Sequence, residues 1–278
     1  VVVSRSNPET GGVVSVDSFN GLTQNIADKT TTDNPHFPSD GTGKQVDKKT
    51  VAVGETVTYT VTYNTVNWMD RDNDKTNGAE VQITKYVVSD TLPDFLKDVT
   101  VTDVKVDGVS ILTTGGITGI NEFAKNKTFE IPWTEGEGEN IRSKYQNGAV
   151  LTIIYTAVIT KNILNSDSDT DASNPKNHKN EITITPNGFT PDNDDKAKTD
   201  GYTGTILVQK YAADSNGTAD KTRPLAGAKF KLANGNTGDI KYAKIDETTK
   251  EVSWVGIDEA TVVTTEADGV AKFEGLAK

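Results

Sequence analysis

Three polar residues that are far apart in the sequence have types that can react with one another. Lys44 in GKQVDKK has the strand parity of Val46, and Asp90 in KYVVSDTLP shares a face with an aromatic and an apolar residue. Late in the chain, Asn180 of NEITITP lies on the same face as two isoleucines. Because alternate residues of a strand share one face, the lysine, the acid and the asparagine are each predicted to point into one core.

These residue types permit one specific reaction in an apolar site. Burial disfavours the charged form of a lysine, so Lys44 becomes a nucleophilic amine. The same environment raises the pKa of an acid such as Asp90, which then stays protonated and polarises the side-chain carbonyl of Asn180. Attack by the amine releases ammonia and leaves a Lys–Asn isopeptide bond, and proximity in the folded core supplies the rate.

Other candidate sites are weaker. His36 and His178 stand in polar loops, away from any Ser or Asp pattern typical of a triad, and neither HExxH nor a Gly-rich phosphate loop occurs. The runs DRDND (70–74) and DSDTD (167–171) hold Asp at alternate positions, which suits hard cations. Both runs break the EF-hand pattern, because Lys or Ala stands where Gly is needed, so we expect solvated loops and no bound metal.

The elements that must position Lys44, Asp90 and Asn180 are strands. TVTYTVTY, which begins at Thr56, alternates Thr with Val or Tyr as a half-buried strand does. Five further segments are predicted to contain strands: EVQITKYVVSD, VTVTDVKV, KTFEIPW, AVLTIIYTAVIT and NEITITP. Only NEFAKN and NIRSKYQNG are expected to hold a short helical turn. This pattern is typical of an all-β fold of immunoglobulin-like β-sandwiches.

A polar segment rich in turn-forming residues, GFTPDNDDKAKTDGYTG, divides the chain. We predict an N-terminal extension or edge segment over residues 1–40. A β-sandwich over residues 41–200 carries the crosslink, and a second, smaller β-sandwich over residues 201–278 follows it. The two sandwiches are expected in tandem and are not close sequence repeats of each other.

Composition excludes several functions. The 278 residues carry a net charge of −11, from 29 basic and 40 acidic residues, which argues against nucleic acid or an anionic membrane as a partner. The chain has no cysteine, so disulfides and thiolate zinc sites are excluded. No run approaches the length of a membrane span, and the first residues look like an internal cut. One methionine, two histidines and many Thr, Asn, Asp and Gly residues suit an extracellular bacterial surface protein better than a cytosolic enzyme. Without disulfides, such a protein needs another source of robustness.

The segment GKQVDKKTVAVGETVTYTVTY, followed by VVSDTLP, resembles the opening of middle domains in sortase-assembled backbone pilins of Gram-positive bacteria. Those domains are similar to collagen-adhesin (CnaA-type) sandwiches and carry a Lys–Asn isopeptide bond with an acid beside it. The resemblance implies that Lys44, in a K-x-V-D pattern, is bonded to Asn180 and that Asp90 is the acid. Lys48 and Lys49 are alternative lysines, because they lie close to Lys44 in the sequence.

The second predicted sandwich is similar to the small CnaB-type domain, through TILVQKY, PLAGAKFKL and TTEADGVAKFEGL. In that pattern a lysine ends the first strand, and Lys210 has this position. Strand parity alone leaves the alternative that Lys210 reaches water from the strand end. The family's acid and asparagine motifs are absent, because the chain stops at FEGLAK. We therefore expect Lys210 to be unbonded and its domain to be C-terminally incomplete.

The resemblance implies a structural shaft subunit of an extracellular, cell-wall-anchored pilus. Its partners are neighbouring pilin subunits joined by a sortase, its only catalysis is single-turnover crosslinking of itself, and no cofactor is expected. The alternative is a minor pilin or collagen-adhesin-like adhesin that binds host surface proteins of the matrix, although no large inserted domain favours it. The hypothesis that the protein is a conventional hydrolase or glycosidase is supported only by its abundant Asp and Glu residues.

Overall fold

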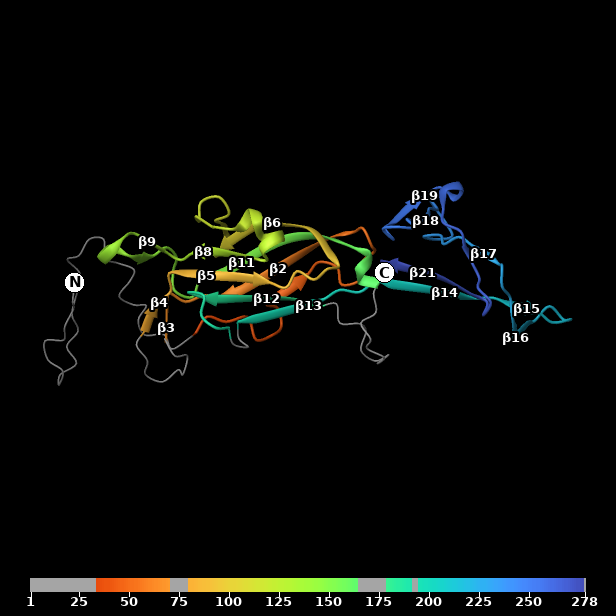
Figure 1. Ribbon diagram of the computed structural model, residues 1–278, viewed down its shortest axis with the longest axis horizontal. Coiled ribbons are helices and arrows are strands. Elements are labelled where there is room, and N and C mark those ends of the chain that lie inside the picture. Colours follow the sequence, from red (N-terminus) through yellow and green to blue (C-terminus); the bar gives the residue numbers. More distant parts are fainter. Residues whose placement is uncertain (1–33, 71–79, 165–178, 192–194, 278) are drawn as a thin grey trace.

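The computed structural model describes residues 34–70, 80–164, 179–191 and 195–277, and its regular elements are mainly strands (Figure 1). Within these ranges the α-helical part is one short helix, α1 (Phe123–Asn126). Four single 3-10 turns accompany it: η2 (Ile120–Glu122), η3 (Gly138–Asn140), η4 (Lys161–Leu164) and η5 (Ile257–Glu259). The prediction of an all-β fold is confirmed.

Two antiparallel sheets form the larger part of the molecule. The first has the order β1 (Lys44–Val46), β2 (Thr56–Asn64), β11 (Val150–Ile159), β6 (Leu96–Val106), β7 (Val109–Ser110). The second has the order β13 (Lys196–Asp200), β12 (Lys179–Pro186), β5 (Lys85–Asp90), β8 (Thr128–Pro132). Buried residues of both sheets belong to one hydrophobic cluster, so the sheets pack face to face as a β-sandwich.

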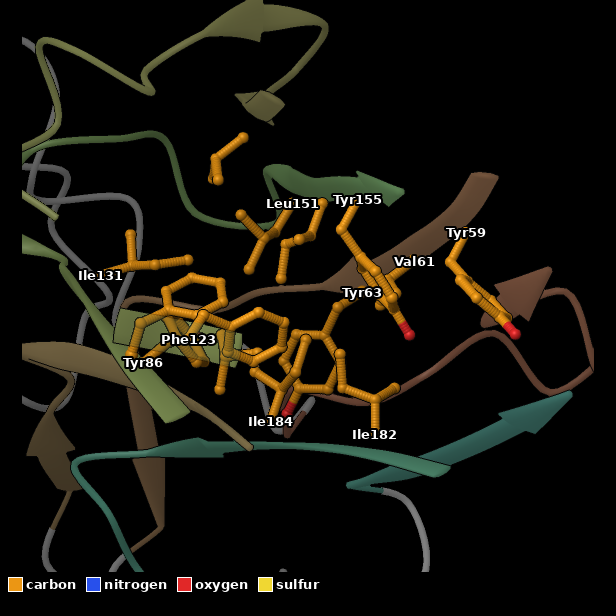
Figure 2. Packing of buried hydrophobic residues seen from close by; sticks show 14 of the residues in the cluster. Tyr59, Val61, Tyr63, Tyr86, Phe123, Ile131, Leu151, Tyr155, Ile182 and Ile184 are labelled. Atoms are coloured by element: carbon orange, nitrogen blue, oxygen red, sulfur yellow. The ribbon is translucent and has the colours of Figure 1, made fainter. Parts of the chain in front are cut away.

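Strict alternation explains why β2 and β11 form the middle of this core. In β2, Val57, Tyr59, Val61 and Tyr63 are buried while the intervening threonines are partly exposed. β11 alternates in the same way and pairs with both β2 and β6. Figure 2 shows the aromatic and aliphatic side chains of these strands meeting those of β5 and β12 between the sheets. The β-branched residues favour the strands, and the period of two selects the buried face.

Short strand pairs extend one end of the sandwich. β3 (Trp68–Asp70) pairs with β4 (Glu80–Gln82), and β9 (Thr134–Glu135) pairs with β10 (Arg142–Ser143). The helical turn expected in NEFAKN is present as α1. The turn expected in NIRSKYQNG is wrong except for its first residue, because Arg142 and Ser143 pair with β9 and the Arg142 side chain also binds Glu135.

Beyond residue 200 the chain forms only two-stranded sheets, which lie at one end of the elongated molecule (Figure 1). The pairs are β14 (Gly204–Gln209) with β21 (Val270–Leu276), β15 (Tyr211–Ala213) with β16 (Ala219–Pro224), β17 (Lys229–Phe230) with β20 (Val263–Thr264), and β18 (Tyr242–Ile245) with β19 (Val252–Val255). We propose that this change of sheet organisation marks the predicted boundary between the two domains.

The connection between β1 and β2 ties the two parts of the molecule together. The Val51 N–H donates to the Tyr202 carbonyl at 2.8 Å, and the Val53 N–H donates to the Gly275 carbonyl at 3.0 Å. The Val53 carbonyl in turn accepts from the Val252 N–H at 3.0 Å. Val51 and Val53 are buried, so these bonds are shielded from water. The strand that carries Lys44 therefore runs directly into the junction.

We expect Gly275→Ala to weaken this junction. Gly275 has a φ of 75°, and an added Cβ would lie 3.0 Å from Cγ2 of Val53. The left-handed backbone alone costs a non-glycine residue about 1–2 kcal/mol, and the contact adds to this. Gly217→Ala is the matched control, since Gly217 has a φ of 80° and nothing within 4 Å of an added Cβ. Urea unfolding should give the lower midpoint for Gly275→Ala, and equal midpoints would contradict this account.

Candidate functional site

Lys44 lies on the edge strand β1, where it pairs with Val61 of β2. Alternation along KQV turns Gln45 outward and Lys44 inward, and the Lys44 side chain is 0% exposed. It is one of the largest fully buried side chains among the described residues. A buried ammonium is costly unless it is paired or neutralised, so the groups that meet it determine its chemistry.

The carboxylate of Asp90 meets this lysine from the opposite sheet. Asp90 ends β5, and its Oδ2 accepts a hydrogen bond from Nζ of Lys44 at 2.7 Å. The backbone N–H of Leu92 donates to Oδ1 at 3.0 Å. Both charged groups have fully buried side chains, and the ion pair bridges the two sheets of the sandwich.

Asn180, near the start of β12, brings a buried amide to the same place. It is 1% exposed and lies opposite Thr199 of β13. Its Nδ2 donates to the hydroxyl of Tyr155 at 2.7 Å. Its Oδ1 is buried and has no hydrogen-bond partner among the described residues. A buried carbonyl oxygen without a partner is uncommon in native proteins, and a catalytic role is one of the explanations for it.

Tyr155 of β11 links the acid to the amide. Its hydroxyl donates to Oδ2 of Asp90 at 2.9 Å and accepts from Asn180. The ring stacks on Tyr59 with centroids 4.9 Å apart, and Nζ of Lys44 lies 5.6 Å from the centroid of each ring. Figure 2 shows the hydroxyls of both rings directed to the side of β12 and β13. We call Lys44, Asp90, Asn180, Tyr59 and Tyr155 the buried polar cluster.

The two tyrosines were not singled out by the sequence analysis, although a signal for them existed. Tyr59 occupies an apolar position of the TVTYTVTY alternation, and Tyr155 has the parity of Ile153 and Ala157 in AVLTIIYTAVIT. Their inward direction was therefore predictable. That their hydroxyls would lie beside Asn180 depends on how three strands from two sheets are placed.

Burial shifts the proton equilibria of the cluster. It lowers the pKa of Lys44 to about 8, although Asp90 and Glu181 oppose this shift by stabilising the cation. Burial also raises the pKa of Tyr59 to about 12 and, together with the charge of Asp90, raises the pKa of Tyr155 well above its ordinary value. The neutral lysine amine therefore predominates only above about pH 8, far below the pH at which an ordinary lysine loses its proton, while both tyrosine hydroxyls stay protonated.

The alternative lysines lie outside the cluster. The side chain of Lys48 is 50% exposed, and its Nζ lies 3.6 Å from Oε1 of Glu55. Lys49 is exposed, and its carbonyl accepts a hydrogen bond from the N–H of Tyr202 at the junction. Of the three lysines considered for the bond, the structure brings only Lys44 to Asp90.

The remaining candidate residues are not brought together. Lys210 directly follows β14 and is exposed, so it is not part of the buried polar cluster. His36 hydrogen-bonds through its ring to the Asn34 carbonyl and to the Asn64 side chain, and His178 lies outside the described residues. The acidic run at 167–171 and all of the run at 70–74 except Asp70 also lie outside them.

Among the described residues, no group of three or more His, Cys, Asp or Glu side chains is placed to hold a metal ion. No helix in the described part of the chain is long and apolar enough to cross a membrane.

Comparison with known proteins shows what the chain resembles. No family model matches it, and no curated protein matches it. The solved pilus 2b backbone protein of group B streptococcus is 28% identical, with 85% of this chain and 80% of that chain covered and a TM-score of 0.60. The chain matches Gram-positive pilus backbone pilins in structure. Backbone pilins are structural, extracellular and cell-wall-anchored proteins of the pilus, not enzymes, and their domains are immunoglobulin-like.

Two other backbone pilins are similar at lower levels. The 35 kDa C-terminal fragment of the major pilin GBS80 of Streptococcus agalactiae is 15% identical, with a TM-score of 0.46. The match covers 88% of this chain and 80% of that fragment. The pilus backbone protein RrgB of Streptococcus pneumoniae is 12% identical, with a TM-score of 0.45. The match covers 83% of this chain and 82% of that chain.

The lowered pKa of Lys44 leads to a prediction for Asn180→Ala, a variant that forms no bond and leaves the Lys44 amine free. The pKa of Lys44 is about 8 in the folded state and 10.5 ordinarily, so between these values the unfolded chain binds more protons. The unfolding free energy of Asn180→Ala should therefore rise with pH from about 8 towards 10.5. Urea unfolding across this range measures it. The Asn180→Ala/Lys44→Met protein should lack the rise, and parallel pH profiles of the two proteins would contradict the assignment.

Proposed function

We propose that this chain is a structural subunit of the shaft of a covalently assembled cell-surface pilus, stabilised by an isopeptide bond between Lys44 and Asn180. The observation that supports the bond is the fully buried Lys44–Asp90 ion pair beside the Asn180 amide. The observation that supports the pilus is the structural match to a group B streptococcus pilus backbone protein. The subunit is extracellular and anchored to the cell wall, and neighbouring pilin subunits are its polymerisation partners.

The geometry supports the reaction in a definite order. Nζ of Lys44 and Oδ2 of Asp90 are 2.7 Å apart in a water-excluded core. Transfer of the proton along this hydrogen bond turns two buried charges into two neutral groups, which a low dielectric favours. The neutral amine attacks Cγ of Asn180, the Cγ–Nδ2 bond breaks, and ammonia leaves. Because the fold holds all groups in place, no external enzyme is needed.

The proposed bond ties the two sheets of the sandwich. Lys44 lies on β1 of one sheet and Asn180 on β12 of the other, and both strands are close to the same open edge of the sandwich. Tension that enters through β1 then passes into β12 without separating the sheets. A filament subunit that has no cysteine gains in this way the covalent closure that disulfides give other extracellular proteins.

Intact-protein mass spectrometry tests the bond. The wild-type protein should be lighter than its sequence mass by one ammonia, and a tryptic peptide should join the segments that contain Lys44 and Asn180. Lys44→Ala and Asn180→Ala should each have the full sequence mass, because each removes one reacting atom.

Lys48→Ala and Lys49→Ala are the matched controls, because both remove a neighbouring lysine that lies outside the buried polar cluster. Both should still lose ammonia. A wild-type protein of full sequence mass would overturn the proposal. Loss of ammonia by Lys44→Ala would show that another lysine forms the bond.

The bond should also raise stability. Closing a loop of about 136 residues, from 44 to 180, restricts the unfolded chain by about 5 kcal/mol on the entropy model of crosslinks. We therefore expect guanidinium unfolding to show a markedly lower midpoint for Asn180→Ala than for the wild type. Asn162→Ala, which removes an exposed amide that binds Asp94, is the control and should change the midpoint little. Equal midpoints for Asn180→Ala and the wild type would show that no crosslink constrains the chain.

A further inference from the structure

One step of the proposed reaction needs a group that Lys44, Asp90 and Asn180 do not provide by themselves. The amide nitrogen of Asn180 must gain a proton before it can leave as ammonia. Among the described residues, the hydrogen-bond partners of the Asp90 carboxylate are Lys44, Leu92 and Tyr155, and the amide of Asn180 is not one of them. The acid therefore has no direct path to the leaving nitrogen.

The hydroxyl of Tyr155 fills this gap. Its oxygen lies 2.9 Å from Oδ2 of Asp90 and 2.7 Å from Nδ2 of Asn180. We propose that Tyr155 is a fourth catalytic residue of the crosslinking reaction, which orients the Asn180 amide and relays a proton from Asp90 to the leaving nitrogen. This inference rests on the proposed function, because it concerns the same Lys–Asn bond.

The relay balances over four steps. Lys44 first gives a proton to Asp90, and its neutral Nζ attacks Cγ of Asn180. Cγ becomes tetrahedral, Oδ1 takes the negative charge, and the lone pair of Nδ2 is no longer delocalised into the carbonyl. Tyr155 then donates its hydroxyl proton to Nδ2 and takes the proton of Asp90. The Asp90 carboxylate next removes a proton from the new Nζ–Cγ nitrogen. The Cγ–Nδ2 bond breaks, the carbonyl re-forms, and neutral ammonia departs.

The direction of the hydrogen bonds agrees with this order. In the structure the Tyr155 hydroxyl donates to Asp90 and accepts from the planar amide of Asn180. An amide nitrogen is a donor and not an acceptor. Once Asp90 is protonated and the lone pair of Nδ2 is localised, both hydrogen bonds can reverse by rotation of the O–H groups of Tyr155 and Asp90, without movement of a heavy atom.

The fold holds this hydroxyl rigidly. Tyr155 is 0% exposed and lies on β11, which pairs with strands on both sides. Its ring stacks on Tyr59 and meets the edge of Phe123, with centroids 5.9 Å apart. Burial and the charge of Asp90 keep the pKa of the Tyr155 hydroxyl high, so its proton is in place when the reaction begins. A preorganised donor of this kind lowers the barrier to proton transfer.

Tyr155→Phe tests the proposal, since it removes only the hydroxyl and keeps the ring. Each protein is made by cell-free translation, quenched in denaturant at set times, and scored for loss of ammonia by intact mass. We expect Tyr155→Phe to crosslink about 100-fold or more slowly than the wild type, the usual effect of removing a positioned proton donor. Tyr86→Phe is the matched control, because it removes another buried hydroxyl, bound to the Val66 carbonyl, and should crosslink at the wild-type rate.

The outcomes separate this inference from the proposed function. If the wild type and Tyr155→Phe lose ammonia at the same rate, the relay is overturned and the crosslinking function stands. If the wild type does not lose ammonia, both are overturned. Slow crosslinking of Tyr86→Phe as well would show a general effect of lost core hydroxyls and would also overturn the relay.

Two measurements exclude a folding defect as the cause. In the Asn180→Ala background, which forms no bond, adding Tyr155→Phe should leave a cooperative urea transition and an unchanged far-ultraviolet circular dichroism spectrum. Fluorotyrosine incorporated at position 155 restores a hydroxyl and should return the crosslinking rate to within about tenfold of the wild type. Failure of fluorotyrosine to rescue the rate would overturn the relay, because ring packing alone is already preserved in Tyr155→Phe.

Discussion

The buried ion pair between Lys44 and Asp90 is the interaction on which the rest of the site depends. Two opposite charges 2.7 Å apart with no exposed surface are stable only if every remaining hydrogen-bonding site nearby is occupied. Here Leu92 and Tyr155 complete the carboxylate, and two aromatic faces surround the ammonium. Oδ1 of Asn180, the oxygen on the carbon that Lys44 would attack, is a buried atom of this cluster that has no hydrogen-bond partner among the described residues.

Such a pair is a poor source of stability and a good source of reactivity. Hydrophobic residues of the same volume would stabilise a core at least as well as a buried salt bridge. What the ion pair offers instead is a lysine whose pKa has fallen to about 8 and, in the proposed reaction, a proton that passes from Lys44 to Asp90. The proposed isopeptide bond would replace the buried ammonium of Lys44 with a neutral amide and leave Asp90 protonated. The desolvation cost of the two buried charges would then be removed.

The same edge of the molecule carries both the site of the proposed reaction and the connection to the second part. Lys44 lies on β1, and the segment that leaves β1 makes the buried backbone bonds of Val51 and Val53 to the strands beyond residue 200. In a filament subunit, load on the second part would therefore enter the sandwich close to Lys44. The proposed covalent tie between β1 and β12 would resist sliding of the two sheets at the place where that load arrives.

The sequence by itself determined the all-β fold and the inward direction of Lys44, Asp90 and Asn180, because side chains in a strand alternate with a period of two whatever the strand packs against. It left Lys48 and Lys49 open, and it did not identify Tyr155 as a hydrogen-bonding partner, although parity already turned that ring inward. Those points depend on which strands lie opposite one another and on how far each side chain reaches across the core. Only the tertiary structure, which packs β1 and β11 against β5 and β12, decided that one lysine meets the acid and that one tyrosine stands between the acid and the amide.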